Sequence, residues 1–287
     1  PWPADSTAGE ILKGAGLVQE KKRRTRISAH SQPFKDCHHP NAVWSSDFKG
    51  HFALGNRQRC YPLTVSDNDS RFILQCRGLT RTRQRDVRPW YEWIFREYGL
   101  PDAMRIDNGP PFASMALGGI SELSKWWIQL GIAPERIKPG NPQQNGRHER
   151  MHRSLKAAVA SPPKYNMRAQ QQAFNRFVKE FNEQRSHEAL DRKTPSQVYQ
   201  PSMRAYPKRL TPVEYDQGIQ VRHARHNGEI KWQGQLLYIS HVLAKEPIGL
   251  KQVNEECWEI YFCFYLLGFY DERKKKVMPC RQWHGKQ

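Results

Sequence analysis

The sequence predicts an α/β protein in which a mixed domain is followed by a smaller β-rich domain. Strand-like and helix-like stretches alternate through residues 41–190, whereas the apolar period is two in residues 216–287. With 287 residues, the chain is long enough for one large core or two modest ones. We therefore expect a segment 1–40, a domain 41–190, a polar, proline-interrupted linker 191–215 and a domain 216–287.

The net charge of the chain indicates which class of partner it binds. Lys and Arg number 46 against 28 Asp and Glu, and the formal net charge of +18 attracts polyanions. We expect nucleic acid rather than a membrane, because membrane binding would need a basic amphipathic helix with a bulky apolar face. The chain has no apolar run of spanning length and no opening signal peptide, and its six cysteines form no CxxC pair. We therefore expect a cytoplasmic protein with reduced thiols.

Short β-rich runs separated by turn residues open the first domain and continue between helices. The expected strands are 42–48, 61–65, 72–75, 103–106 and 135–138. The expected helices are 88–98, 121–130, 145–160 and 166–184. Four residues of the first helix fall near one side and predict its packing face: Trp90, Trp93, Ile94 and Tyr98. Trp126 and Trp127 of the second helix are also expected in the core.

The two ends of the chain differ in pattern. Residues 6–18 predict a short helix, and the basic run after it comprises Lys21, Lys22, Arg23 and Arg24. We expect this run to contact DNA phosphate, with solvation alone as the alternative. Near the other end, strands 218–224 and 230–232 flank Asn227-Gly228, which tolerates the positive φ of a hairpin turn. Further strands at 236–240, 258–262 and 266–270 complete a small β-barrel-like domain.

Three acidic residues occupy positions from which they can converge. Asp47 lies in an expected strand, Asp107 closes another strand, and Glu149 lies near the start of a helix. Helical spacing puts Glu149 beside cationic residues, with apolar residues on the opposite side. Such carboxylates suit two-metal phosphoryl transfer, in which Mg²⁺ ions activate the attacking hydroxyl and stabilise the leaving oxygen. Spacing alone is weak support, because scattered acidic residues usually lie on the surface.

Three sequence blocks carry these acids: WSSDFKG at 44–50, RIDNGPPF at 105–112 and PGNPQQNGRHER at 139–150. In order and residue type they resemble the three signature blocks of the integrase-core DDE transposases. These are bacterial insertion-sequence enzymes related to retroviral integrases. The stretch RSHEAL at 185–190, with the Thr-Pro that follows it, also resembles the usual sequel to that core.

The resemblance implies an RNase H-like catalytic core in residues 41–190, with Asp47, Asp107 and Glu149 as the catalytic and metal-binding triad. It implies two Mg²⁺ or Mn²⁺ ions bridged by Asp47, attack of water on the phosphodiester at the element's end, and attack of the freed 3′-hydroxyl on target DNA. It also implies a nucleoid-associated homo-oligomer on paired ends of double-stranded DNA. The candidates for phosphate contact on the Glu149 helix are Arg147, His148, His152, Arg153 and Lys156.

The sequence departs from the family pattern in two places. The interval from Asp107 to Glu149 is several residues longer than usual, so an insertion near residues 115–120 has to fit without moving the helix. Residues 6–18 resemble only the last helix of the helix-turn-helix region that normally precedes the core. Because the chain begins at Pro1 in mid-pattern, we expect further sequence upstream.

Two other functions stay open on the sequence alone. One is an inactive or repurposed transposase fragment that only binds DNA, although the presence of all three acids argues against decay. The other is a nuclease of the same fold that cleaves DNA without joining it. A zinc site at Cys37, His38 and His39 is not expected, because these adjacent residues have no second ligand pair at finger spacing.

Overall fold

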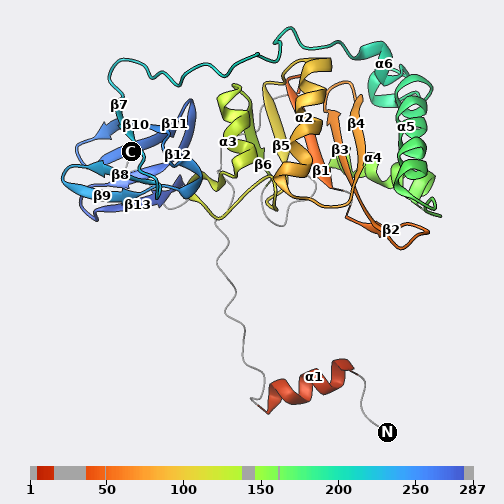
Figure 1. Cartoon of the computed structure of the whole chain (residues 1–287), viewed down its shortest axis with the longest axis horizontal. Coiled ribbons are helices and arrows are strands. Elements are labelled where there is room, and N and C mark those ends of the chain that lie inside the picture. The colour runs from red at the N-terminus through yellow and green to blue at the C-terminus, as the bar shows by residue number, and fades with distance from the viewer. Residues whose placement is uncertain (1–4, 16–36, 49, 138–145, 161, 281–287) are drawn as a thin grey trace.

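The computed structural model describes residues 5–15, 37–48, 50–137, 146–160 and 162–280 (Figure 1). Its first half contains β1 Val43–Phe48, β2 Phe52–Ala53, β3 Arg59–Asp67, β4 Ile73–Leu79, α2 Gln84–Tyr98, β5 Ala103–Ile106, α3 Glu122–Gln129 and β6 Ala133–Arg136, after α1 Asp5–Gly14. Three further helices follow: α4 Gly146–Leu155, which continues as a π-helical turn to Ala160, α5 Met167–Glu183 and α6 Pro195–Val198. No described helix has the length and apolar character needed to cross a membrane.

The first sheet has six strands and joins antiparallel and parallel pairings at β1. β1 pairs antiparallel with β3 and parallel with β5, and β5 pairs parallel with β6. β3 also pairs antiparallel with β4 and with the short β2. The main strand order is therefore β4-β3-β1-β5-β6, with three antiparallel strands beside two parallel ones. This is the RNase H-like arrangement that the sequence predicts.

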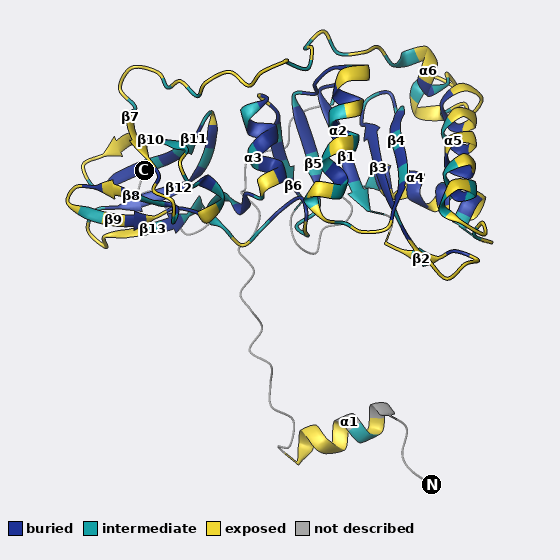
Figure 2. Cartoon of the chain, viewed as in Figure 1, coloured by how far each residue is buried: buried dark blue, intermediate teal, exposed yellow. Residues whose placement is uncertain are grey.

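Helices cover both faces of this sheet. On one face, α2 and α3 pack over a cluster that includes Trp44, Met104 and Trp127. On the other, α4 and α5 pack over a cluster that includes Met151 and Phe174. Figure 2 shows the result: the strands are dark blue with burial, whereas the outer side of α5 is exposed. The sheet is thus buried on both faces, as mixed sheets in α/β proteins usually are.

The packing face of α2 agrees in part with the predicted one, because Ile94 is buried and Trp90 and Tyr98 pack against the core cluster. Its buried residues are Val87, Tyr91, Ile94 and Phe95. Trp93 is 45% exposed, and Trp90 is half-buried with the Arg77 guanidinium 3.7 Å above its ring. The aromatic residues are spread so widely around the helix that their pattern did not identify the inward side. For Trp126 and Trp127 the prediction is confirmed, because both are buried.

The end of the chain is β-rich, as expected, but the described strands do not close into a barrel. The strands are β7 Gln220–His223, β8 Glu229–Trp232, β9 Gln235–Tyr238, β10 Pro247–Asn254, β11 Cys257–Phe262, β12 Tyr265–Asp271 and β13 Lys276–Pro279. Five of them form an open sheet in the order β13-β12-β11-β10-β7, and β8 pairs with β9 in a separate hairpin.

The hairpin predicted across Asn227-Gly228 is wrong in its strand partners. The turn itself exists: Gly228 has φ 82°, and the Arg225 N–H donates to the Glu229 carbonyl. However, β7 pairs with β10, and β8 pairs with β9. The local turn reverses the chain, but pairing with strands later in the sequence decides the sheets.

The insertion near residues 115–120 packs against the C-terminal sheet. Residues 117–119 form a 3-10 helix, and a Cβ on Gly118 would lie 3.1 Å from a side-chain methyl of Leu267 in β12. Ile120 also belongs to the apolar cluster of the C-terminal strands. Nearby, the Lys125 ammonium of α3 lies 3.5 Å from the Glu246 carboxylate. The extra residues therefore connect the two sheets.

Gly119 allows the closest approach in this insertion. Its φ is 70°, and an added Cβ would lie 1.4 Å from Nη1 of Arg136, a buried side chain held by a bond from its Nε to Asn108. We predict that Gly119→Ala lowers the free energy of unfolding by about 2–4 kcal/mol through backbone strain and overpacking. Gly234→Ala is the matched control, because Gly234 has φ 78° but no atom near the added Cβ. Urea denaturation of both variants measures the difference, and equal losses would contradict the close packing.

Candidate active site

Asp47 and Asp107 lie at the same edge of the first sheet. Ser46 of β1 is paired with Ile106 of β5 in the parallel register, and each acid follows directly in sequence. Because parallel strands run in one direction, their carboxyl ends meet at one edge, where α/β proteins commonly bind ligands. Asp47 keeps 27% of its side chain exposed, and Asp107 is half-buried. The structure thus brings together two of the three predicted acids.

The electrostatics of this edge reflect partial burial. Burial raises the pKa of Asp107, while the Gly109 N–H, which donates to its carboxylate over 3.1 Å, and the nearby Arg136 act in the opposite direction. The buried Tyr91 hydroxyl is hydrogen-bonded to Ser46. Burial raises the pKa of Tyr91, and the charges of Asp47 and Asp107 add to this effect. Both carboxylates therefore act on one phenol.

A buried polar layer separates Asp47 from the body of α4. Thr64 Oγ1 lies 2.8 Å from Nε2 of His148 and 2.6 Å from Nε2 of His152. Ser66 Oγ lies 2.8 Å from Nδ1 of His148, and Nδ1 of His152 lies 3.8 Å from the Asp47 carboxylate. Since the Thr64 hydroxyl donates to the Asp47 carbonyl, it accepts from both imidazoles. The layer fixes α4 on the sheet beside Asp47.

His148 and His152 do not face DNA as we expected. Their exposures are 1% and 2%, because α4 turns both rings, together with Met151 and Leu155, toward the sheet. A phosphate outside the protein does not reach rings buried in this way. Their predicted role in DNA binding is therefore corrected: they hold α4 beside Asp47.

The other predicted residues of α4 are exposed. Glu149, Arg153 and Lys156 lie on the outer side, and the exposed Arg147 donates to the Asn68 carbonyl over 2.9 Å. Glu149 as the third acid stays a prediction, as do the DNA contacts of the three cations. The basic run of Lys21, Lys22, Arg23 and Arg24 lies outside the described residues.

The donor chemistry of this edge fits a hard divalent cation. Carboxylate oxygens are the ligands that Mg²⁺ and Mn²⁺ prefer, and an adjacent cation favours the charged form of Asp107 against the effect of burial. Across the described ranges, no three His, Cys, Asp or Glu side chains form a group that could hold an ion. Asp47 and Asp107 could therefore supply two ligands, and a complete site would need a further one.

Sequence reasoning missed Thr64, Ser66 and Tyr91. The signal for the first two is the alternation in β3, where Thr64 and Ser66 occupy one face while Leu63 and Val65 occupy the other. This alternation predicts a polar strip on one face of the strand. That the strip lies beside Asp47 follows only from the register, in which Asp47 is paired with Thr64.

A substitution of Thr64 tests the polar layer directly. Thr64→Val keeps the shape of the side chain but leaves the imidazole donors of His148 and His152 without their acceptor. We predict a loss of about 1–3 kcal/mol in the free energy of unfolding, measured by urea denaturation. Thr211→Val, at an exposed position, is the control and is expected to change stability by less than about 0.5 kcal/mol. Equal stability of the two variants would refute the layer.

Two matches place the chain in a family. Two family models, both described as integrase core domain, match the chain, one over residues 37–142 and the other over residues 130–195. The uncharacterized 31.7 kDa protein of insertion element IS407 from Burkholderia multivorans is 28% identical over 195 residues, which are 65% of this chain and 66% of that protein. The uncharacterized 39.2 kDa protein of insertion element IS476 from Xanthomonas euvesicatoria is 27% identical over 187 residues, 63% of this chain and 50% of that protein. The matches thus span just under two thirds and one half of these relatives.

Solved integrases are similar in part. The HTLV-2 integrase catalytic core domain in complex with magnesium aligns with 56% of this chain and 98% of its own, at 17% identity and a TM-score of 0.45. A chain of the simian T-cell lymphotropic virus intasome aligns with 92% of this chain and 90% of its own, at 17% identity and a TM-score of 0.48. These likenesses are weaker than the sequence matches. On the matches over residues 37–195, the chain belongs to the integrase core domain family.

Proposed function

We propose that the chain is a DDE transposase that cuts DNA at the ends of an insertion element and joins them to target DNA with divalent metal ions. One observation carries the proposal: Asp47 and Asp107, from two separate integrase-like sequence blocks, lie at one edge of an RNase H-like sheet. Membership of the integrase core family and the two insertion-element relatives support it.

In this proposal the carboxylates of Asp47, Asp107 and Glu149 hold two Mg²⁺ or Mn²⁺ ions. When bound, these ions make an attacking hydroxyl more nucleophilic and stabilise the leaving oxygen of the phosphodiester. The protein supplies oxygen donors on a fixed frame. The Gly109 N–H holds the Asp107 carboxylate, and the polar layer under α4 supports Asp47. No covalent intermediate with the protein is needed, because water and then the DNA 3′-hydroxyl are the nucleophiles.

The cationic side chains of the same region serve DNA binding in this proposal. Arg147, Arg153 and Lys156 are exposed on the helix that carries Glu149, where they contact backbone phosphates and position the duplex. The net charge of +18 supplies the long-range attraction. We further propose segments 1–40, 41–190, 191–215 and 216–287 as the N-terminal DNA-binding end, the catalytic core, the linker and the C-terminal domain. We also propose that the protein assembles as a homo-oligomer on paired ends in the bacterial nucleoid.

A strand-transfer assay tests the proposal. A labelled duplex with candidate terminal sequence is incubated with the protein, supercoiled target DNA and Mg²⁺ or Mn²⁺. We predict that Asp47→Asn, Asp107→Asn and Glu149→Gln each reduce the joined product more than 100-fold, because each removes an anionic metal ligand. Affinity for DNA should stay within about twofold of the unchanged protein. Glu180→Gln, at an exposed position of α5, is the control and should keep full activity.

The products separate this function from its alternatives. Cleaved ends without joined product would indicate a nuclease of the same fold. Binding without either product, in the presence of metal and authentic ends, would indicate a protein that only binds DNA. Joined product from Asp47→Asn at the normal rate would overturn the assignment of the carboxylates.

A further inference from the structure

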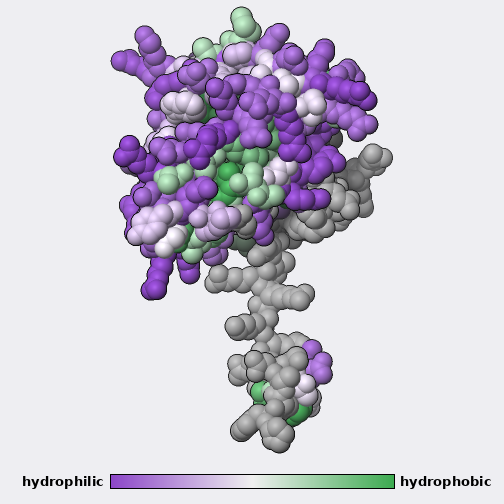
Figure 3. Space-filling model, turned by 90° about the vertical axis from the view of Figure 1, so that its right-hand side faces the viewer, coloured by the Kyte–Doolittle hydropathy of each residue, from purple (hydrophilic) through white to green (hydrophobic). Residues whose placement is uncertain are grey.

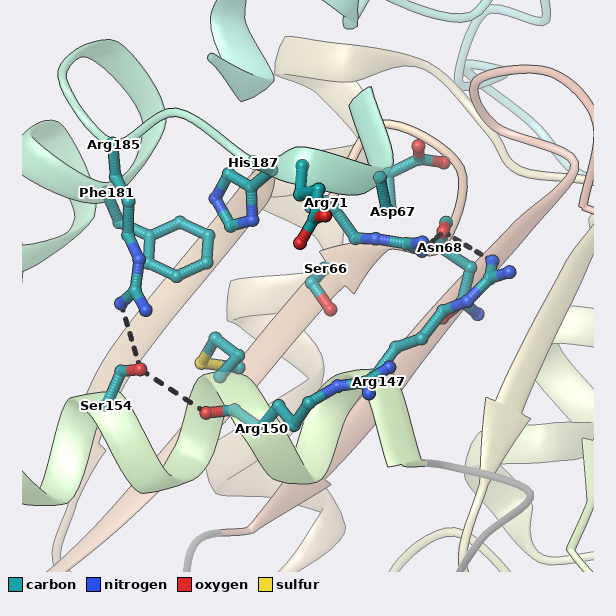
Figure 4. A pocket seen from close by; sticks show the side chains of 13 residues that line it. Ser66, Asp67, Asn68, Arg71, Arg147, Arg150, Ser154, Phe181, Arg185 and His187 are labelled. Carbon is teal, nitrogen blue, oxygen red and sulfur yellow. Dashed lines mark hydrogen bonds between the residues drawn. The ribbon is translucent and has the colours of Figure 1, made fainter. Parts of the chain in front are cut away.

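A cavity of about 350 Å³ lies beside the polar layer, on the side away from Asp47. Its walls come from the turn between β3 and β4, from α4, and from the end of α5 with the segment that follows it (Figure 4). Four arginines line the cavity: Arg71, Arg147, Arg150 and Arg185. We call it the arginine pocket. The surrounding face, which carries α5 and α6, is mostly hydrophilic (Figure 3).

The acidic residues in the lining of this pocket carry less charge than its arginines. Asp67 accepts hydrogen bonds from the Asn41 N–H and from the N–H and hydroxyl of Ser70. Figure 4 shows its carboxylate pointing away from Arg147 and Arg150. Glu188 is the other acid in the lining, and it is exposed to solvent. Four arginines therefore share the lining with two carboxylates, one of which already accepts hydrogen bonds from Asn41 and Ser70.

Three of the four arginines are held in place by neutral oxygens. Arg71 and Arg147 both donate to the Asn68 carbonyl, and Arg185 donates to the Ser154 hydroxyl over 2.9 Å. These bonds orient the guanidinium groups without neutralising them. Burial lowers the pKa of Arg71, and repulsion from Arg147 and Arg150 lowers it further, whereas Asp69 and Asp67 act in the opposite direction. The positive charges are thus close enough to oppose one another, which an anion between them would relieve.

His187 provides an independent sign of a ligand. Its Nε2 atom is buried and has no hydrogen-bond partner among the described residues, while its ring lies 5.0 Å from that of Phe181. Buried polar atoms are nearly always paired, so an isolated one calls for an explanation. An acceptor bound in the pocket would supply the missing partner. Burial, with the charges of Arg185 and Arg71, also lowers the pKa of His187.

We infer that the arginine pocket binds a backbone phosphate of double-stranded DNA, at a site separate from the catalytic carboxylates. A phosphodiester offers several oxygen acceptors and a negative charge, which match guanidinium donors in geometry and sign. The inference rests on the proposed function for the identity of the polyanion.

The location favours DNA over a small free anion. Ser66 of the pocket is paired with Ser45, two residues before Asp47 on β1, which is a separation of about 7 Å along the strand. One turn of duplex spans roughly 34 Å, which is several times this separation, so one duplex is long enough to contact both places. Arg147 and Arg150 also share α4 with Glu149. A phosphate in the pocket would therefore set the register of DNA over the carboxylates.

Charge reversal at the rim tests the pocket. Arg150→Glu and Arg185→Glu change exposed residues, whereas Arg176→Glu is a matched control at an exposed position of α5 outside the lining. The affinity of the full chain for a 30-base-pair duplex is measured in EDTA over a series of salt concentrations, so that metal chemistry plays no part. We expect each pocket variant to bind about tenfold more weakly and to reduce the salt slope by about one. The control should change affinity less than threefold.

Two outcomes would overturn the inference. The first is that the pocket variants and the control bind DNA with equal affinity while their thermal midpoints are unchanged. Arg150→Ala would then also bind DNA as tightly as the unchanged protein. The second is recognition of a small anion only. In that case inorganic phosphate raises the thermal midpoint of the unchanged protein but not that of Arg150→Glu. The affinity for DNA is then the same in the pocket variants as in the unchanged protein. Failure of the proposed catalysis is recognised separately, by the carboxylate variants in the strand-transfer assay.

Discussion

The site depends on the pairing of β1 on both of its edges. β3 binds one edge in the antiparallel direction and β5 binds the other in the parallel direction. The first pairing sets Thr64 opposite Asp47, and the second brings Asp107 to the same end of the sheet. A slip of one residue in either ladder would turn the side chains to the opposite face. Because β1 is enclosed on both faces and both edges, its register is strongly fixed, and so are the positions of the two acids.

Features set by local sequence were predictable. Strand 103–106 has the expected bounds, and the acid that follows it is placed correctly, because an apolar run and a turn define both. The inward side of α4 was not predictable in the same way. His148 and His152 look like surface cations in the sequence, and their burial depends on hydroxyls that β3 supplies 82–88 residues away. Only the tertiary register provides that information, and it also decides which of their nitrogens are donors.

The C-terminal sheet shows the same limit of prediction from the sequence. The turn at Asn227-Gly228 was identified from its residues, but the partners of β7 and β8 were not, because pairing over long distances competes with the local hairpin. The insertion at 115–120 was recognised only as extra length. In the structure it packs on β12, so that residues outside the common family pattern join the core sheet to the sheet beyond it. Family resemblance predicts the shared core well and its additions poorly.

The charges around α4 are arranged in two groups of opposite sign. Asp47 and Asp107 lie at one end of the polar layer, and the guanidinium groups of Arg71 and Arg147 lie beyond the other, near Ser66. The Asn68 carbonyl accepts hydrogen bonds from both guanidinium groups, and the Gly109 N–H donates to the Asp107 carboxylate. In our proposals a divalent cation binds at the acids and a DNA phosphate binds at the arginines. Ligands that bind only the folded state stabilise it, so two such sites would together favour a protein loaded with both DNA and metal. Because the polar layer between the clusters consists of buried, hydrogen-bonded side chains, DNA held at the arginines would be aligned with the carboxylates before any reaction begins.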